Sequence, residues 1–254
     1  MFNDILFWCE FPEEVDWKRL NILLEGKKCR IFFASRSREE YESYKKRIKV
    51  SAVKTGVWPI LPLQEGYWFS GFTSRKNIDF LKEFSGIPMK IDIEPPFPGK
   101  EYTHAKAFAW MIDYMFVKTA QNNEYLAQVI QEVAKKNEVI VSGFALPKKV
   151  RQKYGDPIHL KLKRNFICYS TFFPASWLFF EEFLSRNKGV LTYAAIGLAN
   201  HGIFGNEPEY DCLDEFVRDV KKVKTSGVQN IVVYSIEGIL KKPDADEWLR
   251  VVFE

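Results

Sequence analysis

The sequence predicts an α/β protein of the (β/α)8 barrel class, formed as a single domain by residues 1–254. Eight short apolar runs recur along the chain, each rich in β-branched or aromatic residues, as expected of strands that helices cover on both faces. Helical patterns lie between most of these runs, and eight such units in 254 residues favour a closed barrel over an open sheet. A doubly wound sheet is the alternative, but no strand is followed by G-x-G-x-x-G or a Walker-type loop.

The eight predicted strands share this apolar composition and mostly end in polar or acidic residues. They are Asp4–Phe11, Cys29–Ser35, Thr55–Leu63, Ile87–Glu94, Glu138–Phe144, Phe166–Thr171, Val190–Ile196 and Asn230–Ile236. The residues at their C-terminal ends are candidates for chemistry, because (β/α)8 barrels place their active sites at that face.

Start and stop signals delimit the predicted helices. These are residues 16–24, capped by Asp16 and closed by Gly26; 37–49, opened by the capping box Ser37-Arg38-Glu39-Glu40; 74–84; 101–136, in two pieces broken near Asn122-Asn123; 176–187; 211–225; and a last helix from Asp244. Residues 147–164 are basic and interrupted by Gly155 and Pro157, and they predict a short helix followed by a loop.

Composition narrows the class of protein. A net charge of +4, from 37 basic and 33 acidic residues that are spread along the chain, argues against nucleic acid as a partner. The four cysteines are isolated, which suits a reducing compartment. No signal peptide is evident and the apolar stretches are too short to cross a bilayer, so we expect a cytoplasmic protein without membrane contact. The Lys-, Glu- and Ile-rich, Gln-poor composition would suit a thermophile.

The fourth predicted strand carries the strongest functional signal. Asp92 and Glu94 lie two residues apart, so on a strand their side chains share one face, and Pro95-Pro96 ends the strand directly afterwards. Repulsion between two such carboxylates raises one pKa, and the resulting carboxylic acid can protonate a leaving oxygen near neutral pH. The structural alternative is that either acid caps the next helix or pairs with a basic residue such as Arg36.

A third acid, Glu237, follows the eighth predicted strand. Strands four and eight lie on opposite sides of an eight-stranded barrel, so we expect these acids to face each other across its mouth. Glycoside hydrolysis needs two carboxyl groups about 5–10 Å apart. Glu237 could instead accept hydrogen bonds from main-chain amides near Gly238.

The segment Lys90-Ile-Asp-Ile-Glu94 resembles the end of strand four in the chitinase-like family 18 glycoside hydrolases, and its Asp-x-Glu is similar to that of the family 25 barrel lysozymes. The resemblance implies Glu94 as general acid, Asp92 orienting a substrate acetamido group, Tyr169 steadying that group and Tyr234 stacking under the sugar. The chain departs from the chitinase pattern, because Lys90 and Ile87 stand where that family has further aspartates. Tyr234 also replaces its usual Trp.

We therefore expect an enzyme, a glycosidase-like hydrolase acting on an oligosaccharide, N-acetylated ones included, that needs no cofactor. The candidates for binding its substrate are Tyr169, Tyr234, Trp68, His201 and Arg36. One alternative is an enzyme for a small phosphorylated metabolite bound near His201, Gly202 and Gly238, or for a metabolite chelated to Mg²⁺. The carboxylates of Asp92, Glu94 and Glu237 could hold that Mg²⁺, whereas three scattered histidines predict no His-based metal centre. The other alternative is a barrel that binds carbohydrate or protein without turnover. The position of Trp68 is as compatible with a packing residue as with an aromatic platform for a sugar.

Overall fold

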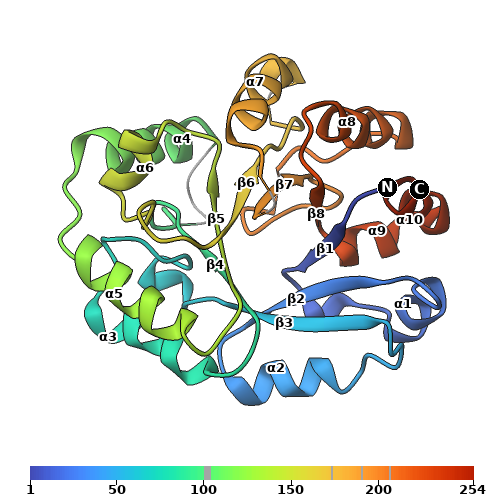
Figure 1. Cartoon of the computed structure of the whole chain (residues 1–254), viewed down its shortest axis with the longest axis horizontal. Helices are drawn as coiled ribbons and strands as arrows, with labels where there is room; N and C mark the ends of the chain where they lie inside the picture. Colours follow the sequence, from blue (N-terminus) through green and yellow to red (C-terminus); the bar gives the residue numbers. More distant parts are fainter. Residues whose placement is uncertain (100–103, 173, 190, 206) are drawn as a thin grey trace. The chain divides into compact units, whose positions relative to one another are not determined.

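The computed structural model describes residues 1–99, 104–172, 174–189, 191–205 and 207–254. It confirms the predicted fold class: parallel strands form a closed barrel in the order β1-β2-β3-β4-β5-β6-β7-β8 (Figure 1). The strands are β1 Asp4–Cys9, β2 Cys29–Ser35, β3 Val53–Pro59, β4 Met89–Asp92, β5 Val139–Phe144, β6 Lys163–Ile167, β7 Thr192–Ile196 and β8 Asn230–Tyr234.

The helices follow the predicted alternation. They are α1 Trp17–Leu23, α2 Arg38–Lys45, α3 Arg75–Asp79, α4 His104–Ile112, α5 Asn123–Ala134, α6 Lys148–Lys153, α7 Trp177–Asn187, α8 Leu213–Thr225, α9 Ile236–Lys241 and α10 Ala245–Phe253. Short 3-10 turns occur at Pro12–Glu14, Leu63–Glu65, Phe80–Phe84 and Pro174–Ser176, and a π-helical turn, Asp113–Val117, extends α4. No described helix is long and apolar enough to cross a membrane.

Predicted caps are present in the structure. The Asp16 carboxylate accepts a hydrogen bond from the Arg19 amide at the start of α1, and the Ser37 hydroxyl accepts one from the Glu40 amide in α2. The predicted starts of the long helical region at Glu101 and of the seventh strand at Val190 lie outside the described residues.

Several predicted boundaries were wrong. The third strand ends at Pro59, because Pro62 and the 3-10 turn Leu63–Glu65 follow it. The sixth begins earlier, at Lys163, and ends at Ile167. Beyond Tyr234 the chain forms α9 instead of continuing as a strand, because the Ser235 hydroxyl accepts a hydrogen bond from the Gly238 amide and caps that helix.

The chain divides into two compact units, each described by itself. Unit 1 comprises residues Met1–Ala34, Tyr41–Gly56 and Arg164–Glu254, and unit 2 comprises Ser35–Glu40 and Val57–Lys163. That residues 1–254 form a single domain stays a prediction. In unit 1, β1 pairs with β2 and β8, and β8 pairs with β7. In unit 2, β4 pairs with β5, and α3 lies beside α5 (Figure 1).

Candidate functional site

The end of β4, in unit 2, holds a buried ion pair. Lys90 and Asp92 are 2% and 3% exposed, and the Lys90 ammonium lies 2.7 Å from Asp92 Oδ2. The same ammonium lies 3.2 Å from the centre of the Trp58 ring, which comes from β3. Lys90 and Asp92 meet because residues two apart on a strand share a face. That spacing is visible in the sequence and could have indicated Lys90, in place of Arg36, as the partner.

The surroundings of Asp92 set its protonation. Burial raises the pKa of Asp92, while the Lys90 ammonium and the nearby Ser142 and Trp58 side chains lower it, and burial is the larger effect. Ser142 stands opposite Asp92 in the β4–β5 register. The predicted rise in a carboxyl pKa is therefore present at Asp92, but the main cause is loss of hydration, not repulsion by Glu94.

Glu94 lies just past β4, which ends two residues earlier than predicted. Its main-chain N–H donates to the Phe69 carbonyl at 3.0 Å, and the Phe69 N–H donates to the Asp92 carbonyl at 3.1 Å. Phe69 and Ile93 thus form a single bridge that continues the strand pairing by one step. The Glu94 side chain is buried, with 8% of the residue exposed.

A groove begins two residues beyond Glu94, and we call it the aromatic groove. Its volume is about 1200 Å³. It is lined by Leu63, Gln64, Glu65, Gly66, Phe72, Thr73, Ser74, Lys76, Asn77, Pro96, Phe97, Pro98, Gly99, Trp110, Tyr114, Lys118 and Thr119. These residues come from the loops after β3 and β4, from α3, and from α4 with the turn that extends it.

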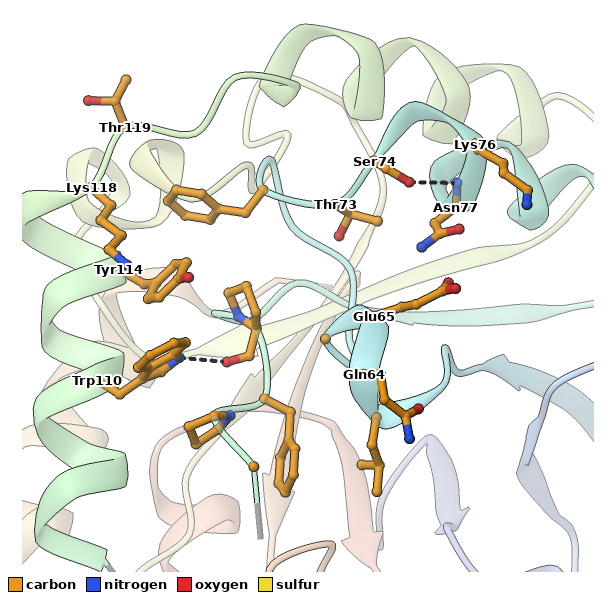
Figure 2. A pocket seen from close by; sticks show the side chains of 17 residues that line it. Gln64, Glu65, Thr73, Ser74, Lys76, Asn77, Trp110, Tyr114, Lys118 and Thr119 are labelled. Carbon is orange, nitrogen blue, oxygen red and sulfur yellow. Dashed lines mark hydrogen bonds between the residues drawn. The ribbon is translucent and has the colours of Figure 1, made fainter. Parts of the chain in front are cut away.

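Aromatic rings form one wall of this groove (Figure 2). The Trp110 and Tyr114 rings lie 4.9 Å apart between centres, and Phe72 meets Tyr114 edge-on at 4.7 Å. The Trp110 indole N–H donates to the Pro96 carbonyl at 3.0 Å, which fixes this wall to the segment after Glu94. The Lys118 ammonium lies over the Tyr114 ring, 4.2 Å from its centre.

Polar side chains, among them those of Gln64, Glu65, Ser74 and Asn77, line the side of the groove that faces Trp110 and Tyr114 (Figure 2). The Ser74 hydroxyl accepts a hydrogen bond from the Asn77 amide at 3.3 Å and caps α3. Rings on one side and amide, hydroxyl and carboxylate groups on the other form a site that can take a ligand with both apolar and hydroxyl-bearing faces.

Two other predicted site residues, Trp68 and Arg36, also belong to unit 2. Trp68 is half-buried and packs edge-on against Tyr67 and Phe97, at 5.5 and 5.9 Å between ring centres. Its contacts are those of a packing residue behind Phe97. Arg36 is exposed, and its main-chain N–H donates to the Glu40 carboxylate at the start of α2, at 2.5 Å.

The remaining predicted site residues belong to unit 1, where Tyr234 and Tyr169 pack together with ring centres 5.7 Å apart. The Tyr234 hydroxyl donates to the carboxylate of Glu10, a buried acid just past β1. Burial, reinforced by Glu10, raises the pKa of Tyr234, so this hydroxyl stays protonated as a donor. Glu10 directly follows β1, and this strand-end position was the sequence signal that could have indicated it.

Glu237 is 1% exposed in the first turn of α9. One carboxylate oxygen accepts hydrogen bonds from the main-chain amides of Glu10, at 2.9 Å, and Phe11, at 3.2 Å. Burial raises the pKa of Glu237, and these main-chain hydrogen bonds oppose that rise. The carboxylate thereby ties the start of α9 to the end of β1, a structural contact made with the amides of Glu10 and Phe11 and not with those near Gly238 that the sequence suggested.

His201 is largely exposed. Its Nδ1 lies 3.1 Å from the Glu207 carbonyl, and its Nε2 lies 3.6 Å from the Glu209 carboxylate. A Cβ added to the neighbouring Gly202 would meet the Glu207 carboxylate at 2.6 Å and the Tyr234 hydroxyl at 3.1 Å. Because a carboxylate and a phosphate are both negatively charged, the Glu207 carboxylate beside Gly202 disfavours a phosphate bound there.

Sequence reasoning missed the buried Asp219 of α8. Its carboxylate accepts hydrogen bonds from Ser170, from Tyr210 at 2.8 Å and from the Trp177 indole at 2.8 Å, so it joins the end of β6 to α7 and α8. A helix-face aspartate gives no sequence signal for such a role. Across the described residues, no group of three or more His, Cys, Asp or Glu is arranged to hold a metal ion.

The closed parallel sheet places the chain among (β/α)8 barrels, and the solved structures with a similar fold include glycoside hydrolases. One is the PgaB (BpsB) glycoside hydrolase domain from Bordetella bronchiseptica, with a TM-score of 0.64, 11% identity and 99% of each chain covered. Another is the catalytic domain of a family GH18 chitinase from the fern Peteris ryukyuensis, with a TM-score of 0.52, 11% identity, and 99% of this chain and 100% of that chain covered.

A third is β-glucuronidase 2 from Bacteroides uniformis, with a TM-score of 0.50 and 11% identity, covering 92% of this chain and 30% of that chain. No protein-family model and no curated protein matches the sequence. At this level of identity, the similarity establishes a shared barrel fold.

Proposed function

We propose that this protein is a glycoside hydrolase-like barrel that binds an oligosaccharide in the aromatic groove, with Glu94 as its general acid. The observation that carries the proposal is the position of the groove. Its first lining residue after β4 is Pro96, whose Cα lies within about 7.6 Å of that of Glu94, because consecutive Cα atoms are about 3.8 Å apart.

The chemistry of the groove suits a sugar chain. The apolar faces of pyranose rings pack on aromatic side chains such as Trp110 and Tyr114, while ring hydroxyls need donors and acceptors such as Gln64 and Asn77. A volume of about 1200 Å³ exceeds what a single small metabolite fills, and this favours an oligosaccharide.

In the proposed reaction, the carboxylic acid of Glu94 gives its proton to the glycosidic oxygen as the bond from that oxygen to the anomeric carbon breaks. Water then adds to the anomeric carbon and gives its proton to the Glu94 carboxylate, which completes hydrolysis and restores the acid. Asp92 is held by Lys90, so we assign it an orienting role toward the substrate, as the resemblance to family 18 implies for an acetamido group.

Binding without turnover is the second candidate function, and one observation favours it. The Lys90 ammonium neutralises Asp92, so the end of β4 has one fewer ionised carboxylate available for acid–base chemistry than its sequence indicates. The third candidate, a phosphorylated metabolite near Gly202, is disfavoured by the Glu207 carboxylate against that glycine.

Binding and turnover can be measured on the same protein. We expect the wild type to bind N-acetylglucosamine oligomers in calorimetry and to release reducing ends from one or more glycosides between pH 4 and 8. Trp110→Ala should weaken binding about tenfold, as expected for loss of one stacking ring. Leu178→Ala, an exposed residue in unit 1, is the control. Binding without released reducing ends would favour the second candidate, and neither binding nor turnover would reject the proposal.

A further inference from the structure

Tyr154 presents an unexplained buried hydroxyl close to the proposed acid. The residue lies at the C-terminal end of α6 and is fully buried, and its hydroxyl has no hydrogen-bond partner among the described residues. A buried hydroxyl without a partner is destabilising relative to the same ring without it. Phenylalanine would fill the same space without the free-energy cost of burying an unpaired hydroxyl. Packing alone therefore does not explain why this residue is a tyrosine.

The backbones of Tyr154 and Glu94 are hydrogen-bonded to the same short segment of the chain. The Gly71 N–H donates to the Tyr154 carbonyl at 2.8 Å, and two residues earlier the Phe69 carbonyl accepts the Glu94 N–H at 3.0 Å. The contact on Tyr154 is tight, since a Cβ on Gly155, where φ is +109°, would lie 2.5 Å from the Gly71 nitrogen. A three-residue segment, 69–71, therefore bonds to both residues.

Three charged groups act on the Tyr154 hydroxyl: Asp156, Arg151 and Glu94. Asp156 and Arg151 form a buried ion pair with each other, and Arg151 also donates to the Leu146 carbonyl at 3.0 Å. Burial raises the pKa of Tyr154, and the two carboxylates raise it further, so the hydroxyl keeps its proton and can act only as a neutral group. Of the two carboxylates that act on the Tyr154 hydroxyl, that of Glu94 lies outside the ion pair between Arg151 and Asp156.

We propose that Tyr154 is a positioning residue for Glu94, donating a hydrogen bond to its carboxylate once that carboxylate is ionised. Its catalytic consequence rests on the proposed function, because the ionised form is the one left after Glu94 has given up its proton. The contact itself can be tested without turnover.

The test is a double-variant cycle of Tyr154→Phe and Glu94→Gln, in which the unfolding temperature of all four proteins is measured at pH 3 and pH 8, below and above the unfolded-state pKa of Glu at about 4.3. A hydrogen bond to the carboxylate lowers its folded-state pKa, so its stabilisation is present above the unfolded-state pKa and lost as pH falls. We therefore expect Tyr154→Phe to lower the unfolding temperature more at pH 8 than at pH 3 with Glu94 present, and equally at both with Glu94→Gln.

An equal effect of Tyr154→Phe in both backgrounds and at both pH values would overturn the proposal and make Tyr154 a packing residue. A pH dependence that survives Glu94→Gln would assign the contact to Asp156 and overturn it as well. Where a glycoside is turned over, Tyr154→Phe should lower kcat about tenfold and leave KM unchanged. If the wild type hydrolyses no glycoside, the proposed function fails while the cycle still decides the Tyr154–Glu94 contact.

Discussion

Replacing Lys90 by methionine tests how the end of β4 is held together. The substitution keeps the length of the side chain but leaves the Asp92 carboxylate buried without the ammonium that lies 2.7 Å away. Removing one partner of a buried ion pair costs about 3–5 kcal/mol. Loss of the contact with the Trp58 ring adds about 1–2 kcal/mol.

The loss should depend on pH in a defined direction. Burial already raises the pKa of Asp92 and Lys90 opposes this, so Lys90→Met should raise it further. A raised folded-state pKa gives stability that is complete below the unfolded value of about 3.9 and is lost as pH rises through the folded-state pKa. Each pH unit in that window costs about 1.4 kcal/mol, so the variant should be least stable relative to wild type at pH 8.

The assay is urea unfolding of the wild type and variant at pH 4.5 and pH 8. Lys82→Met is a matched control, because it removes an exposed ion pair with Asp79 and should change little. Lys90→Met combined with Asp92→Leu should recover most of the loss, since an apolar pair replaces the buried charges. A loss below about 1 kcal/mol for Lys90→Met, equal at both pH values, would refute the role given to this ion pair.

Three further outcomes follow from the contacts in unit 1 and from the cysteines. Glu237→Ala leaves two main-chain amides without their acceptor and should cost about 1–3 kcal/mol for each in denaturant unfolding; an unchanged midpoint would contradict the structural role. Asp219→Ala should cost about 3 kcal/mol or more, because it removes the shared acceptor of several buried donors; full stability would disprove the network. A thiol reagent should modify the exposed Cys212 alone in the folded protein and all four cysteines after unfolding. The reason is that burial raises the pKa of the other three thiols, that of Cys29 to about 12. Fast reaction of more than one thiol in the native state would contradict this.

The fold was accessible from sequence because its signals are local. Apolar runs such as Cys29–Ser35 and caps such as Ser37 act within a few residues, and both were located correctly. Strand ends were less accessible: nothing in the run Val232–Ile236 distinguishes the last strand residue, Tyr234, from the α9 cap that follows it.

The site was accessible only in part. The spacing of Asp92 and Glu94 made both acids stand out in the sequence. Spacing alone, however, does not decide which basic residue pairs with a carboxylate, as the ion pair between Lys90 and Asp92 illustrates. The aromatic groove draws on segments 63–66, 72–77, 96–99 and 110–119, whose meeting is a property of the folded chain. Tyr154 falls in the segment with the weakest secondary-structure signal, where only the unpaired state of its hydroxyl in the structure draws attention to it.

The most direct test of the central claim is kcat/KM of the wild type and Glu94→Gln on an oligosaccharide that both proteins bind. We expect a loss of about 10²–10⁴-fold in kcat/KM, as for removal of a general acid, with the dissociation constant of the sugar unchanged. Turnover by Glu94→Gln at the wild-type rate would contradict the account and require the proton donor to be sought elsewhere in the protein.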